Sequence, residues 1–226
     1  MFARAPVAVL ACGNPSRGDD ALGPLLLERL RAWLATDGRS AGYELIGDCQ
    51  WQIEHALDLV GRELVLFIDA GALTPAPFVF APVQASGFVG PGSHALSPQA
   101  LLSVLARIGD EPPPAAFVLA VRGERFELGG ALGQNALAHA DAAFAFLQEL
   151  CRAASAAAWR NLLGRSLQGQ GQQSPEYGSA LALDLDLDLE REEMVGPRQA
   201  FIDRQNRLAL ALPVVGEAES GVDHRR

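Results

Sequence analysis

Short apolar runs and helical apolar patterns alternate along the first two thirds of the chain. Five segments have the length and apolar content of strands: residues 7–11, 43–46, 63–69, 77–83 and 116–121. Four segments between or after them place apolar residues at helical spacing: residues 22–34, 53–60, 98–108 and 132–153. This alternation predicts an α/β fold, with a mostly parallel central sheet and helices on both faces.

Local signals refine some of these elements. The prolines in residues 77–83 predict an edge strand, because proline cannot donate a ladder hydrogen bond. Ser97 and Pro98 are a natural N-cap and first helical residue for the helix at 98–108. Gly61 is expected to end the short helix predicted over residues 53–60. That helix is expected to bury one apolar face, made of Ile53, Ala56, Leu57 and Val60.

The pattern changes after about Ala154. Residues 168–175 are polar and of low complexity, residues 181–189 alternate leucine with alanine or aspartate, and residues 198–208 have a helix-like pattern. We therefore predict a single α/β domain over residues 1–154. Residues 155–226 are predicted to form a partly disordered C-terminal extension, to which the sequence assigns no function.

Composition narrows the class of protein. The 226 residues, of which 49% are hydrophobic, suffice for one core with an appended segment. A net charge of −9 argues against nucleic acid as a partner, and the absence of lysine excludes a standard P-loop and a Schiff-base lysine. Cys12, Cys49 and Cys151 are too far apart for a zinc or disulfide pattern. With no targeting segment and no apolar run of transmembrane length, we expect a cytoplasmic protein without a membrane partner.

Three side chains are candidates for chemistry. Asp20 and Asp69 lie at or just beyond the predicted carboxyl ends of strands, and His94 lies in a loop before a helix, so a parallel sheet can bring all three to one edge as partly exposed loop groups. Two carboxylates and an imidazole suit a borderline metal such as nickel or zinc.

Each candidate also has a structural interpretation. Asp19 or Asp20 fits a helix N-cap, Asp69 fits a cap of a nearby loop, and His94 fits an ordinary loop histidine. If Asp19 is a cap, Asp19→Asn should be functionally neutral, because an amide caps nearly as well. The other histidines are expected in packing, surface or tail positions: His55, His139 and His224.

Four motifs together resemble the maturation endopeptidases of [NiFe]-hydrogenases. They are GNPSRGDDALG at residues 13–23, IDAG at 68–71, SHALSP at 93–98 and VRGERFELG at 121–129, and the resemblance runs over about residues 7–151. It implies an α/β fold and removal of a C-terminal peptide from the hydrogenase large-subunit precursor once nickel is in place. Matching motif to motif implies Asp20, Asp69 and His94 as the metal-reading residues. The first acid is commonly glutamate in this family, so whether Asp19 or Asp20 faces the metal stays open.

On this interpretation the partner is the large-subunit precursor, the nickel is carried by that substrate, and the enzyme, expected to be a monomer, has no permanent cofactor. Asp20 or Asp69 is a candidate general base, and nickel activation of water or of the scissile carbonyl is the other route. No Ser-His-Asp order or Cys-His pairing supports a covalent mechanism. Two alternatives remain: a non-catalytic chaperone that recognises the nickel-loaded precursor, and a nucleotide-binding protein, which the glycine spacing of residues 13–15 disfavours.

Overall fold

The computed structural model describes residues 4–85, 96–109 and 111–163. The central element of this part of the chain is a five-stranded sheet. Its strands are β1 (Val7–Cys12), β2 (Tyr43–Asp48), β3 (Leu64–Gly71), β4 (Phe78–Val83) and β5 (Ala115–Arg122). The strand order is β2-β1-β3-β5-β4, and every neighbouring pair is parallel except β4 with β5. The predicted α/β fold and the proline-bearing edge strand are confirmed.

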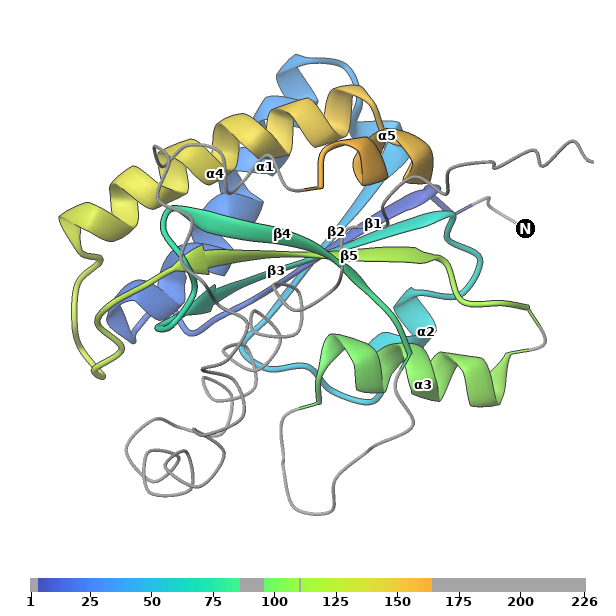
Figure 1. Ribbon diagram of the computed structural model, residues 1–226, viewed down its shortest axis with the longest axis horizontal. Coiled ribbons are helices and arrows are strands. Elements are labelled where there is room, and N and C mark those ends of the chain that lie inside the picture. Colours follow the sequence, from blue (N-terminus) through green and yellow to red (C-terminus); the bar gives the residue numbers. More distant parts are fainter. Residues whose placement is uncertain (1–3, 86–95, 110, 164–226) are drawn as a thin grey trace, which may run out of the picture.

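Helices cover both faces of this sheet. They are α1 (Leu22–Thr36), α2 (His55–Asp58), α3 (Pro98–Ile108), α4 (Gln134–Arg152) and α5 (Ala156–Asn161), with 3-10 turns η1 (Gly18–Ala21) and η2 (Ser40–Gly42). Figure 1 shows α1, α4 and α5 on one face and α2 and α3 on the other. The Ser97 hydroxyl accepts a hydrogen bond from Ala100 N at 2.9 Å and Pro98 starts α3, as the sequence predicts.

Two cores form because successive side chains of a strand point to opposite faces. Along β1, Val9 belongs to the core under α1, α4 and α5, while the next residue, Leu10, belongs to the core under α2 and α3. Both side chains are fully buried. A parallel sheet covered on both faces needs apolar residues at every position, which explains the unbroken apolar runs in the sequence.

The chain reverses its winding direction at β1. From β1 it passes through α1 to β2 on one side, and from β2 it passes through α2, on the opposite face, to β3 on the other side of β1. In open α/β sheets such a switch point leaves a crevice outside the carboxyl ends of the two strands. The fold therefore makes the carboxyl ends of β1 and β3 the first place to look for a site.

Of the four residues predicted to form the buried apolar face of the helix at 53–60, only Ala56 is buried. The helix is a single turn, and Ile53, Leu57 and Val60 are 56%, 54% and 45% exposed. Trp51 and Leu59 fill the core in their place, at 3% and 0% exposure. A one-turn helix does not sustain a buried stripe, so the flanking residues supply the packing. Helix α2 ends at Asp58 with Leu59 as its C-cap, so the ending predicted at Gly61 comes three residues too late, although Gly61 has φ of +72°.

The described chain continues past Ala154 into α5. The Trp159 side chain is fully buried in the core under α1 and α4, and its Nε1–H donates to Leu150 O at 2.9 Å. The segments predicted at residues 168–175, 181–189 and 198–208, and His224, lie outside the described residues. None of the helices in the described part of the chain combines the length and apolar content needed to cross a bilayer.

Candidate active site

The first loop, residues 13–21, leads from β1 to α1 and places Asp20 at the edge of the sheet. A Cβ atom on Gly13 would lie 2.0 Å from Asp20 O, so only glycine allows the loop to fold back this closely. The backbone N–H of Asn14 donates to Oδ2 of Asp20 at 2.8 Å. This contact orients the Asp20 carboxylate beside the end of β1, where it is 8% exposed.

Asp69 lies within β3, one strand away. Its Oδ1 accepts the N–H of Ala70 at 2.8 Å, and it is 4% exposed. The alternation along β3 puts Asp69 on the same face as Phe67, toward α2 and α3. Turn η1, which carries Asp20, contacts β3. The structure thus brings the elements that carry Asp20 and Asp69 together, but the prediction of partly exposed loop groups is wrong, because both carboxylates are buried.

His94 lies outside the described residues. The described chain resumes at Leu96, whose N–H donates to Trp51 O at 3.3 Å. The Trp51 ring packs edge to face on Phe67, with ring centroids 5.6 Å apart. Within the described ranges, no group of three or more histidine, cysteine, aspartate or glutamate residues is arranged to hold a metal ion. The three-residue metal site therefore stays a prediction.

The carboxylate of Asp19 has a different environment from that of Asp20. It is 1% exposed, and its Oδ2 accepts the backbone N–H groups of Glu124 at 2.8 Å and Arg125 at 3.0 Å. Its Oδ1 accepts Gly133 N–H at 2.8 Å. The cap interpretation is wrong for this residue, because α1 begins after Ala21 without a side-chain cap. The expectation that Asp19→Asn is functionally neutral therefore no longer holds, because it assumed that Asp19 is a helix cap.

The partners of Asp19 belong to a second loop, residues 123–133, which joins β5 to α4. Further hydrogen bonds fasten this loop to the first loop: Asp19 N to Arg125 O at 2.7 Å, Gly18 N to Gly130 O at 3.0 Å and Gly129 N to Ser16 O at 2.7 Å. Gly18 has φ of +53°, and a Cβ atom there would lie 2.5 Å from Arg125 O. This association was not predicted; the signals for it were the second carboxylate beside Asp20 and the glycines of the second loop.

Two other histidines have structural environments. His55 is 8% exposed, packs edge to face on Trp51, and places Nε2 3.5 Å from Oδ2 of Asp48. His139 is half-buried, and its Nδ1 lies 3.0 Å from Arg122 O. Both agree with the packing or surface positions expected from the sequence.

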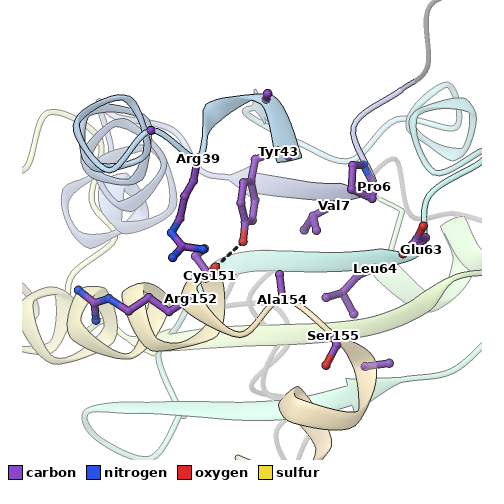
Figure 2. A pocket seen from close by; sticks show the side chains of 14 residues that line it. Pro6, Val7, Arg39, Tyr43, Glu63, Leu64, Cys151, Arg152, Ala154 and Ser155 are labelled. Atoms are coloured by element: carbon purple, nitrogen blue, oxygen red, sulfur yellow. Dashed lines mark hydrogen bonds between the residues drawn. The ribbon is translucent and has the colours of Figure 1, made fainter.

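A cavity of about 510 Å³ lies at the opposite edge of the sheet, where β1, β2 and β3 begin. Figure 2 shows Tyr43 directed toward Cys151 in this cavity, and the Tyr43 hydroxyl donates to Cys151 O at 2.7 Å. Burial raises the pKa of the Cys151 thiol to about 12 and also raises the pKa of Tyr43. The cavity contains none of the candidate residues, so it does not change the location of the site.

These features define a class of protein: a doubly wound α/β protein with three buried carboxylates, Asp19, Asp20 and Asp69, at the carboxyl edge of its switch point. No protein-family model matches the sequence, and no curated protein matches it significantly.

Solved structures identify the fold more narrowly. The [NiFe] hydrogenase maturation protease HycI from Thermococcus kodakarensis KOD1 aligns with a TM-score of 0.51 and 19% identity, over 66% of this chain and 94% of that one. The hydrogenase maturating endopeptidase HybD from E. coli gives 0.50 and 20%, over 66% and 93%. An Escherichia coli endopeptidase solved in solution gives the same four values. The chain therefore has the fold of the hydrogenase maturation proteases, and the resemblance seen in the sequence is confirmed for the fold.

Proposed function

We propose that this protein is an endopeptidase that removes the C-terminal peptide of a [NiFe]-hydrogenase large-subunit precursor after nickel insertion. The observation that carries the proposal is the pair of buried carboxylates at the switch point, Asp20 in the turn that follows β1 and Asp69 in the neighbouring strand β3. The solved structures that share the fold, described as maturation protease and maturating endopeptidase, support the same reaction. Nickel is part of the substrate, and the enzyme needs no resident metal. The free cysteines suit action in the reducing cytoplasm.

His94 is proposed as the third residue that reads the nickel. The support comes from its neighbour in sequence, Leu96, which bonds to Trp51 on the face of the sheet toward which Asp69 points. Two carboxylates and one imidazole form a donor set that suits a divalent metal of nickel's type. Because the precursor brings the metal, productive binding depends on prior nickel insertion.

The buried carboxylates fit a hydrolysis by direct attack of water. One of them accepts a proton from water as the oxygen attacks the scissile carbonyl carbon, and the proton then passes to the departing amine as the C–N bond breaks. Contacts from Asn14 N–H and Ala70 N–H fix the orientation of the two carboxylates before substrate arrives. Preorganised groups of this kind lose little freedom during the reaction.

Mass measurement of the large subunit tests the proposal directly. The protein is incubated with nickel-loaded and with nickel-free precursor, and loss of the C-terminal peptide is expected only from the loaded form. Asp20→Asn, Asp69→Asn and His94→Ala should each abolish or sharply reduce the loss. Asp48→Asn is a matched control, because Asp48 ends β2 at the same edge but faces His55. Binding of loaded precursor without any mass change would favour a chaperone instead.

A further inference from the structure

Asp19 accepts hydrogen bonds at both of its carboxylate oxygens, and nothing in the proposed chemistry uses it. Three backbone N–H groups of the second loop point at its two oxygens, at 2.8, 3.0 and 2.8 Å. A buried carboxylate is costly unless such donors compensate it. The donors come from residues more than a hundred positions later in the chain, so Asp19 joins two segments that the sheet alone does not hold together.

The second loop also connects to the strand that carries Asp69. Its first residue, Gly123, donates to Gly71 O at 3.1 Å, just beyond Asp69 in β3. Asp69 itself lies opposite Ala120 in the ladder between β3 and β5. The loop is therefore tied to the Asp69 strand at one end and to Asp19 along its length. Asp20 is the next residue after Asp19 and shares a peptide unit with it.

From this arrangement we propose that Asp19 is a positioning residue, whose carboxylate holds the first loop against the second loop and so sets the place of Asp20 relative to Asp69. The proposal rests on the proposed function of the Asp20–Asp69 pair. The two adjacent aspartates thus have separate tasks. The Asp19 carboxylate binds backbone N–H groups of the second loop, and Asp20 is the residue proposed to act on the substrate.

Asp19→Asn tests this role, because it keeps the size of the side chain but turns one acceptor into a donor. That donor faces a backbone N–H, so at least one of the three contacts is lost. Faster amide hydrogen exchange is expected at Glu124, Arg125 or Gly133. With nickel-loaded precursor, kcat should fall roughly ten- to a hundredfold, because small displacements of reacting groups are costly. The KM should stay within about twofold, since Asp19 is buried away from the substrate.

Two further variants separate positioning from general loss of stability. Tyr43→Phe removes the hydrogen bond to Cys151 O at the opposite edge of the sheet and should lower Tm without changing kcat. Arg17→Met removes the bond from Arg17 Nε to Phe126 O, 3.2 Å long, which is another tie between the same loops. Arg17 is exposed, so this variant folds even if Asp19→Asn does not, and a two- to fivefold fall in kcat is expected.

The outcomes decide between the two proposals. If wild-type protein cleaves and Asp19→Asn retains wild-type kcat, the positioning role is overturned and the proteolytic function stands. If Asp19→Asn does not fold, wild-type kcat in Arg17→Met leads to the same conclusion. If wild-type protein does not cleave loaded precursor, the proteolytic function is overturned and the role of Asp19 in it falls as well. A lower kcat with unchanged KM in Asp19→Asn, and normal kcat in Tyr43→Phe, supports positioning.

Discussion

Replacing Trp159 by alanine should strongly destabilise the α/β unit. The Trp159 ring is fully buried and packs edge to face on Phe117 and Phe80, with ring centroids 5.4 and 6.2 Å away. Truncating a buried tryptophan costs about 3–5 kcal/mol through lost contacts and the cavity left behind. Its hydrogen-bond acceptor, Leu150 O, also receives Ala153 N–H, so the carbonyl keeps a partner and adds little to this cost.

The expected loss is large enough to measure by calorimetry or by circular dichroism. For a protein of this size, 3–5 kcal/mol corresponds to a fall in Tm of roughly 6–20 °C. Truncation after Ala154, the boundary predicted from sequence, removes the same side chain and should cost at least as much.

Trp33→Ala provides the matched control. Trp33 is half-buried on α1 and lies under the Arg152 guanidinium, 5.3 Å from the ring centroid. Its loss should cost less than half as much as that of Trp159, because less apolar surface is removed from the interior. If Trp159→Ala and Trp33→Ala had equal effects on Tm, or if truncation after Ala154 had none, then α5 would not be part of the cooperative core.

Three further predictions concern stability and the site. Asp20→Asn and Asp69→Asn should each lower processing by at least about tenfold while Asp48→Asn does not, as measured by the mass of the large subunit. Leu57→Ser should change the free energy of unfolding by no more than about 0.5 kcal/mol, because Leu57 is exposed, whereas Leu59→Ala should cost about 2–5 kcal/mol in the same denaturant titration. Burial raises the pKa of the Cys151 thiol from 9.0 to about 12. The protonated thiol therefore contributes its full share to the free energy of unfolding below pH 9, and this contribution is lost as the pH rises toward 12. Cys151→Ala should therefore flatten the decline of Tm above about pH 9, and an unchanged slope would contradict this assignment.

The sheet could be predicted from sequence because its strands are buried on both faces. Segments such as β3 and β5 are almost wholly apolar, and the capping signal at Ser97 fixed the start of α3. Helix α2 was mispredicted because it is a single turn, where periodicity carries little information. Its buried neighbours, Trp51 and Leu59, lie outside the turn itself.

The candidate site was predictable only in part, for a different reason. Asp20 and Asp69 follow from the rule that carboxyl ends of parallel strands share an edge. The task of Asp19 does not follow from any such rule, since its partners are backbone N–H groups of Glu124, Arg125 and Gly133. Every residue except proline has that donor, so the signals in the sequence, a second carboxylate and the glycines of the second loop, do not identify the partners.

The place of Trp159 along the chain also matters while the protein is being synthesised. At least about 60 residues follow the described core, and a ribosome adding 5–20 residues per second needs roughly 3–12 s to make them. During that interval the aromatic cluster of Phe80, Phe117 and Trp159 is already present in the nascent chain. Once Trp159 has left the ribosome, the nascent chain holds all the buried core residues of the described part of the structure, and the α/β unit can close before translation ends.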